Sequence, residues 1–197
     1  MTEKKRPLTT LVIGEQSDRS ALLKSALTQA GYTVLACITS TRHLVEQVGE
    51  LNPDILVADL YSPDRDTLED LQALFRSQPL PVVMFAQDEE TLTIEKAIRA
   101  GVSAYVVNEI ADTRLRPLLK VAITHFREDR ALRTELEETR HTLAERKMIE
   151  KAKGLLMEQR GLDEEAAYQL LRKTAMDGGQ RVAELARSLI RAAELLG

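Results

Sequence analysis

Strand-like and helix-like segments alternate through residues 1–125, and this alternation constrains the fold more than any other feature of the chain. Pro53–Leu60 and Pro81–Ala86 are nearly continuous apolar runs, which is typical of strands covered on both faces. Asp18–Gly31 instead carries apolar residues at helical spacing and stops at a glycine. Repeated β/α units of this kind predict an α/β fold, with a doubly wound parallel sheet and helices on both of its faces.

Five β/α repeats are expected. The expected strands are residues 8–13, 32–38, 53–60, 81–86 and 104–107, and the expected helices are residues 18–31, 40–51, 90–101 and 113–125, with a loop and a helix over 62–78. Ser40 or Thr41 is the expected cap of the second helix, because short hydroxyl side chains are preferred at that position.

The rest of the chain has only helical patterns. Residues 126–143 contain no Gly or Pro and place Leu132, Leu136, Thr139 and Leu143 at spacings of four, three and four, as in the a/d seam of a coiled coil. The seam is short, so a single amphipathic linker helix explains it equally well. We divide the chain into domains at residues 1–125, 126–143 and 144–197.

Three helices are expected in the last domain, at residues 144–160, 164–176 and 180–196. Asp163 is the expected N-cap of the second, because a side-chain oxygen there accepts a hydrogen bond from a free backbone N–H. Residues 142–197 carry 10 basic and 9 acidic side chains and are the only segment that is not acidic, in a chain of net charge −4. This charge balance argues against indiscriminate coating of nucleic acid.

Several classes of protein are disfavoured by what the sequence lacks. Cys37 is the only cysteine, which excludes an intramolecular disulfide. The N-terminus has no apolar signal region, and no run approaches the ~18 apolar residues of a spanning helix. We therefore expect a cytoplasmic protein without a membrane segment. No paired nucleophile and base, glycine-rich phosphate loop or metal-ligand cluster is apparent, so we do not expect an enzyme.

Asp59 closes the third predicted strand, at the carboxyl edge where ligands bind in sheets of this type. The stretch LYSPDRD follows and places Pro63 four positions beyond Asp59. Through these residues and the β/α repeats, residues 8–125 resemble the receiver domains of two-component response regulators. The resemblance implies that Asp59 is the candidate phospho-acceptor.

The pocket around Asp59 departs from the family pattern. Aspartyl phosphorylation needs a divalent metal held by neighbouring acids, and donors that stabilise the transferred phosphoryl group. Receivers supply two acids after the first strand, a hydroxyl after the fourth and a lysine after the fifth. The sequence has Gly14 and Glu15, then Ala86, then Asn108 followed by Glu109. One acid remains, whereas the hydroxyl and the lysine are absent.

We therefore interpret residues 1–125 as a pseudo-receiver that signals by binding a protein. Two alternatives stay open: Asp59 is a working phospho-acceptor, with Mg²⁺ bound by Glu15 and Asp59, or it merely ends a strand in a scaffold. No cofactor is expected apart from Mg²⁺ in the phosphorylated case. Tyr105 stands at the family's switch-aromatic position, although an aromatic residue in a final strand is also typical of a core.

The last domain carries an ordered set of residues that is more specific than any single motif. They are Ile149, Ala152-Lys153-Gly154, Leu156-Met157, Gly161, Glu165, Ala167-Tyr168, Leu171-Arg172, Ala175-Met176, Val182-Ala183 and Ile190. This set closely resembles the ANTAR domain, the RNA-binding output module of antiterminators. Together with the degraded receiver and the connecting coil, it is similar to nitrate-assimilation antiterminators of the NasT type and, less closely, to the AmiR amidase regulator.

Helical spacing brings basic side chains of this domain into rows. Lysines hold phosphates, while an exposed aromatic ring and an arginine stack on unpaired bases. The candidate RNA-binding residues are Lys147, Lys151, Lys153, Gly154, Arg160, Tyr168, Arg172 and Lys173. Some of these residues also have a structural alternative to RNA binding. Gly154 is typical of tight helix packing, Tyr168 of a core position, and Arg172 and Lys173 of a solvated helix face.

The resemblance also implies a function and partners. Proteins of this family stabilise paired hairpins in a transcript leader, which prevents a terminator from forming so that RNA polymerase reads through. A NasS-like nitrate/nitrite-binding sensor protein is the implied controlling partner, and we expect a homodimer through Leu132, Leu136 and Leu143. The alternative is a phosphorylation-driven response regulator with a DNA-binding output, although no helix-turn-helix spacing is apparent.

Overall fold

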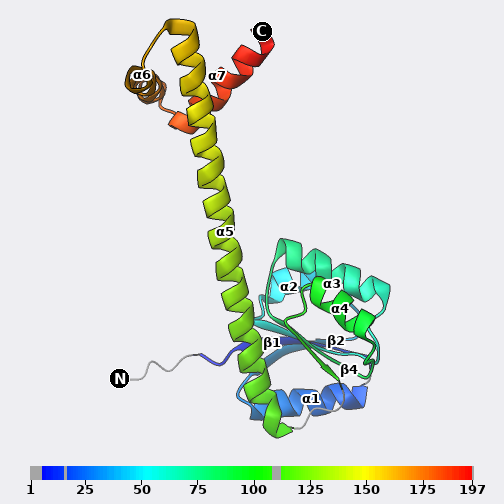
Figure 1. Cartoon of the computed structure of the whole chain (residues 1–197). Coiled ribbons are helices and arrows are strands. Elements are labelled where there is room, and N and C mark those ends of the chain that lie inside the picture. The colour runs from blue at the N-terminus through cyan, green and yellow to red at the C-terminus, as the bar shows by residue number, and fades with distance from the viewer. Residues whose placement is uncertain (1–5, 16, 108–111, 197) are drawn as a thin grey trace. The chain divides into compact units, whose positions relative to one another are not determined.

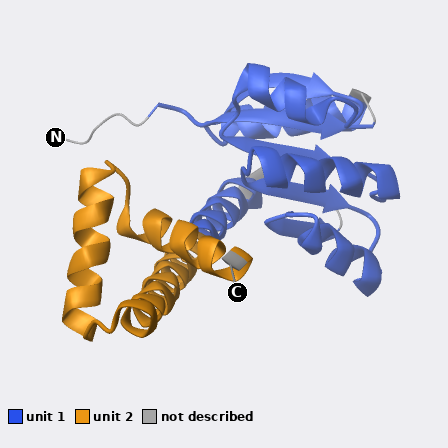
Figure 2. Ribbon diagram, turned by 90° about the horizontal axis from the view of Figure 1, so that it is seen from above, with its two compact units in different colours: residues 1–130 blue, residues 131–197 orange. Residues whose placement is uncertain are grey.

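The computed structural model describes residues 6–15, 17–107 and 112–196 and divides into two compact units, residues 1–130 and 131–197 (Figure 2). Unit 1 is an α/β unit and unit 2 is a helical unit. The division falls inside one helix, α5 (Asp112–Arg160), which contributes residues to both units.

The α/β unit contains a five-stranded parallel sheet in the order β2-β1-β3-β4-β5. Its strands are β1 (Thr9–Gly14), β2 (Thr33–Ile38), β3 (Ile55–Asp59), β4 (Val82–Ala86) and β5 (Ala104–Val107). Every residue of β3 and β4 is buried. The prediction of a doubly wound parallel sheet is confirmed, because strands covered on both faces need apolar side chains at every position.

Helices cover both faces of this sheet (Figure 1). They are α1 (Ser17–Gln29), α2 (Leu44–Leu51), α3 (Arg65–Ser77) and α4 (Thr91–Arg99), together with the start of α5. Helices α2, α3 and α4 pack on one face, where Leu44, Leu71 and Met84 share a core. Helix α1 and the start of α5 pack on the other, where Phe85 and Leu119 share a second core.

Helix α2 begins later than expected, at Leu44 instead of Ser40 or Thr41. The Thr41 hydroxyl donates a hydrogen bond of 2.7 Å to Asp70 on α3, and the Ser40 hydroxyl accepts one from the backbone N–H of Arg42. His43 precedes the helix in a left-handed conformation with φ of 59°. The predicted cap is wrong because both hydroxyls are used outside the helix.

Residues 113–160, expected as three successive helices, form part of the continuous helix α5. No Gly or Pro lies between Pro117 and Gly154, so no residue favours a break there. The short coiled-coil pattern is thus part of a longer helix.

The helical unit consists of the end of α5, α6 (Glu164–Asp177) and α7 (Val182–Leu196). Asp163 caps α6 as predicted, because its side chain accepts a hydrogen bond of 2.7 Å from the backbone N–H of Ala166. Its buried cluster consists of Ala152, Leu156, Ala167, Leu171, Ala186 and Ile190. Among the helices of the described residues, none is both long and apolar enough to cross a membrane.

Candidate functional site

Asp59 lies at the carboxyl end of β3, directly beside Gly14 at the end of β1. Its carboxylate is almost fully buried, with 4% of the side chain exposed. Arg19, in the first turn of α1, donates two hydrogen bonds to it: Nη2 to Oδ1 at 2.7 Å and Nε to Oδ2 at 3.1 Å. Both carboxylate oxygens therefore already have a charged partner, in the bidentate geometry that makes such pairs strong.

The residues around Asp59 do not fit Mg²⁺ as they are arranged. Magnesium requires a near-octahedral oxygen shell and keeps several waters, whereas the cavity lined by Glu15, Arg19 and Asp59 measures about 10 Å³, barely the ~10–15 Å³ that one water needs. A side chain at Gly14 would collide with the Ser20 hydroxyl, so the position of the missing acid is filled. Among the described residues, no group of three or more His, Cys, Asp or Glu side chains could hold a metal.

The other pocket positions add no phosphoryl-binding group among the described residues. Ala86 is buried at the end of β4 and has no hydroxyl. Asn108, the remaining predicted pocket residue, lies outside the residues that the structure describes. Tyr105 is half-buried against the core, and its hydroxyl donates a hydrogen bond of 2.8 Å to the backbone oxygen of Asp88. Burial, partly reinforced by the Asp88 charge, raises the pKa of Tyr105 above its usual value.

In the helical unit, Lys153 differs most from its prediction. Helical spacing predicts an exposed cation, but the side chain is only 9% exposed. Its Nζ lies 2.9 Å from the carboxylate of Glu150 and donates a hydrogen bond of 2.7 Å to Glu164 on α6. Hydrogen bonds to Glu150 and Glu164 raise the pKa of Lys153, and the one from Lys153 lowers the pKa of Glu164. The prediction of exposure is wrong because α6 brings Glu164 to this lysine.

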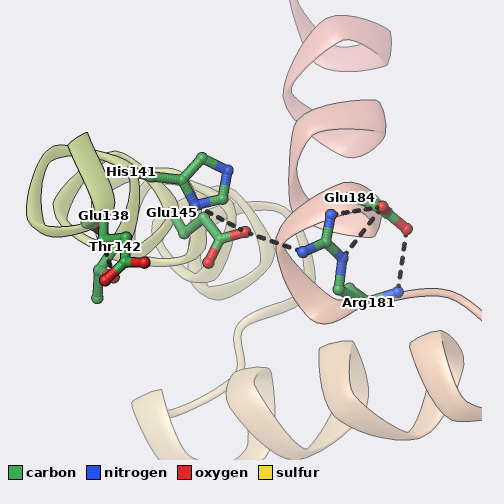
Figure 3. Close-up of polar contacts among 6 residues, drawn as sticks. All are labelled: Glu138, His141, Thr142, Glu145, Arg181 and Glu184. Carbon is green, nitrogen blue, oxygen red and sulfur yellow. Dashed lines mark hydrogen bonds and ion pairs between the residues drawn. The ribbon is translucent and has the colours of Figure 1, made fainter. Parts of the chain in front are cut away.

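Two further cations are paired between helices. Lys151 donates a hydrogen bond of 2.7 Å to Glu194, which joins α5 to α7. Arg181, just before α7, donates to Glu184 at 3.1 Å through Nη2, and its Nη1 lies 3.7 Å from Glu145 on α5 (Figure 3). These pairs connect α5 with α7 and with the residue that precedes α7.

The remaining RNA-binding candidates are exposed. They are Lys147, Gly154, Arg160, Tyr168, Arg172 and Lys173. Tyr168, for which the core was the alternative, is 40% exposed. A Cβ added at Gly154 would meet no atom within 4 Å, so tight packing inside the described chain does not explain this mid-helix glycine. The structure thus distinguishes the cations paired with a carboxylate of another helix, Lys151 and Lys153, from the exposed candidates Lys147, Arg160, Arg172 and Lys173.

Comparisons with known proteins match both units. Residues 10–120 match the model of the response regulator receiver domain, and residues 137–190 match that of the ANTAR domain. The transcriptional regulatory protein PdtaR of Mycobacterium tuberculosis is 30% identical over 166 residues, which are 83% of this chain and 81% of that protein. The chain belongs to the ANTAR-domain response regulators.

Two further comparisons concern parts of other proteins. The nitrate regulatory protein of Klebsiella oxytoca is 30% identical over 176 residues, which are 89% of this ANTAR-domain regulator but only 38% of that protein. The signal receiver domain of a modulated diguanylate cyclase from Desulfovibrio desulfuricans G20 superposes with a TM-score of 0.55 at 22% identity, over 62% of the regulator and 98% of that domain. This second likeness shows the receiver fold alone. Both matched models describe regulatory domains.

The predicted dimer seam of the regulator lies on α5. Leu132, Leu136 and Leu143 are 64%, 49% and 52% exposed, and every residue from Arg127 to Ala144 is exposed. The helical pattern thus leaves three leucines of one seam in water within a single chain.

Sequence reasoning missed two partners in this ANTAR-domain regulator. Arg19 gave one weak signal: it stands in the first turn of the helix after β1, at the same sheet edge as Asp59. Glu164 lies in the first turn of α6, where an acid is favourable whatever it contacts, so its type and position give no signal of a further partner. Its second role, pairing with Lys153, depends on how α6 packs against α5.

Proposed function

We propose that this regulator is an RNA-binding antiterminator whose helical unit binds tandem hairpins in a transcript leader and prevents a terminator from forming. The observation that carries the proposal is the match of residues 137–190 to the ANTAR domain, over a unit whose Arg172 and Lys173 face solvent. A small basic surface of this kind suits the loops of folded RNA, because it can contact splayed bases without coating a duplex.

The exposed residues have two different roles in RNA binding. Lys147, Arg160 and Lys173 hold phosphates, and Tyr168 and Arg172, four residues apart on α6, stack on unpaired bases. Lys153 supports this surface indirectly, because its ammonium group is bound by Glu150 and Glu164.

A homodimer places two helical units on one RNA. Its proposed seam contains Leu132, Leu136 and Leu143, which would otherwise remain in water. Two linked units bind two hairpins more tightly than one unit does, because the second contact becomes intramolecular.

We further propose that a ligand-sensing partner protein controls the regulator, with nitrate or nitrite as the sensed ligand. The similarity to a nitrate regulatory protein supports the pathway, and the absence of a hydroxyl at Ala86 supports control without phosphate. In cells, Asp59→Asn should leave inducer-dependent antitermination largely intact, and deletion of the sensor should make antitermination constitutive. Loss of antitermination in a folded Asp59→Asn variant would reject this part of the proposal.

The RNA proposal is tested with the full chain by mobility shift against a leader RNA with tandem hairpins and against duplex DNA. We expect preference for the RNA, and Arg172→Ala should weaken binding by about 10-fold, the effect of about 1.4 kcal/mol. Lys173→Ala should also reduce the slope of log affinity against log salt concentration by about the amount that one phosphate contact contributes. Lys24→Ala, an exposed lysine of α1, is the matched control. Preference for the duplex would instead support the DNA-binding alternative.

A further inference from the structure

We propose that Arg19 is a built-in counter-ion that takes the place of a divalent cation at Asp59. Its guanidinium contacts both oxygens of the carboxylate, at 2.7 Å and 3.1 Å, from a helix that starts close to the end of β1. Asp59 is the most deeply buried acid of this edge, and the buried charge is neutralised from within the chain. This inference deepens the partner-control part of the proposed function and does not depend on RNA binding.

The neighbouring residues support the same assignment. The Ser20 hydroxyl occupies the space of a Cβ at Gly14, so no second acid can be placed there without displacing it. Glu15 is exposed, and its carboxylate accepts a long hydrogen bond of 3.5 Å from the backbone N–H of Tyr61. Among the residues that the structure describes, Glu15 and Asp59 are the only acids that line this small cavity, and Arg19 already contacts Asp59.

Charge explains why the guanidinium excludes a metal ion. A divalent cation at Asp59 would face the positive charge of Arg19 across a few ångströms in a mostly buried site, where charges are poorly screened. The guanidinium would therefore have to leave before the metal could bind. Its departure would cost both hydrogen bonds of the bidentate pair, and a bound metal ion would have to compensate for their loss. The pocket consequently keeps the Arg19–Asp59 ion pair whether or not divalent metal is present.

The experiment is a titration of the full-length protein with Mn²⁺, monitored by tyrosine fluorescence, because Tyr61 lines the cavity and the paramagnetic ion quenches a nearby ring. The unmutated protein should show no saturable quenching beyond that of its Asp59→Asn variant. Arg19→Ala should gain a saturable site with an apparent affinity at least ~10-fold above the upper limit that the titration sets for the unmutated protein, since the competing internal state is removed. Mg²⁺ should compete with the Mn²⁺ bound by this variant.

Three variants make the result decisive. Arg19→Gln keeps an amide donor beside Asp59 but no charge, and it should gain the metal site even if Arg19→Ala does not fold. Arg76→Ala removes an exposed arginine at the end of α3 and should behave like the unmutated protein. Tyr61→Phe, in the Arg19→Gln background, should lose the tyrosine signal while the thermal midpoint still rises with Mg²⁺.

Two outcomes would overturn the proposal. One is saturable binding of Mn²⁺ by the unmutated protein that Asp59→Asn abolishes. The other is a folded Arg19→Gln variant that binds no metal. Neither outcome bears on the RNA assay, so failure of this inference and failure of the RNA-binding proposal are distinguishable.

Discussion

The two units of the regulator bury very different amounts of apolar surface. Among the described residues, the α/β unit has two core clusters, one on each face of its sheet, with 15 and 12 buried residues. The helical unit has one cluster of six, three of which are alanines. The apolar area buried determines most of the favourable free energy of folding. The α/β unit is therefore stabilised mainly by its core, whereas the helical unit relies in addition on ion pairs between its helices.

The two units also differ in which charged side chain is buried and in what neutralises it. In the α/β unit the buried charge is the carboxylate of Asp59, and its partner Arg19 is partly exposed. In the helical unit the buried charged side chain is that of Lys153, whose ammonium group is held by two largely exposed carboxylates. The first pair neutralises the carboxylate at the carboxyl end of β3. The second set joins helices whose shared core is small, and it leaves other cations free for a ligand.

The strongest test of this comparison is a truncation in the smaller core. Leu171 is 1% exposed, and Leu171→Ala should lower the free energy of unfolding by about 2–5 kcal/mol, because it leaves a cavity in a cluster with few other large side chains. Calorimetry should show the loss confined to the transition of the helical unit. The matched Leu119→Ala, at a buried position of the α/β unit, should affect the other transition. A single shared transition that shifts equally in both variants would contradict independent units.

The proposed seam on α5 provides the second test. Leu136→Lys should shift the regulator from dimer to monomer in sedimentation, because a charge is costly to bury between two helices. Arg133→Lys on the same helix keeps its charge and should leave the dimer intact. If the unmutated protein sediments as a monomer at all concentrations, the seam is not an interface between copies.

Acidity tests the ion pairs at the edge of the helical unit. Lys153 holds the pKa of Glu164 below its usual value, so the stability this pair contributes is present above the unfolded pKa of about 4.3 and is lost as the pH falls through the folded pKa. The raised pKa of Lys153 predicts a second loss as the pH rises above about 10.4. Thermal midpoints of the helical unit measured against pH should show both limbs.

Glu164→Gln is the control for the acid limb of that profile. The variant should lose most of the acid-dependent decrease while its alkaline limb, which also depends on Glu150, persists. An acid limb identical to that of the unmutated protein would assign the effect to another carboxylate.

The smallest expected effect is at Gly154. Gly154→Ala should raise the stability of α5 by up to about 1 kcal/mol, because alanine favours a helix and the added Cβ meets nothing within 4 Å. If the leader RNA approaches the helix backbone closely at Gly154, the added methyl group of the same variant should weaken RNA binding. Greater stability with unchanged RNA affinity would remove Gly154 from the interface and leave Arg172 and Lys173 in it.

The parallel sheet with helices on both faces was predictable from the amino-acid sequence, whereas the start of α2 and the continuity of α5 were not. The apolar runs of β3 and β4, the buried stripe with Ala152 and Leu156, and the cap at Asp163 were all predictable, because each depends on residues a few positions apart. The position of Asp59 at a strand end follows from the same reasoning. Family resemblance added what the receiver and ANTAR patterns imply, and the comparisons confirmed both domains.

The partners of the charged side chains became apparent only from how the elements pack. Arg19 and Asp59 are 40 residues apart in the chain, and Thr41 and Asp70 are 29 apart. Lys153 is buried because α6 turns back after Gly161, which has a positive φ of 63°, and brings Glu164 against α5. Periodicity shows which face of a helix is apolar, but the pairing of long polar side chains depends on how whole elements pack, and no local pattern encodes that packing.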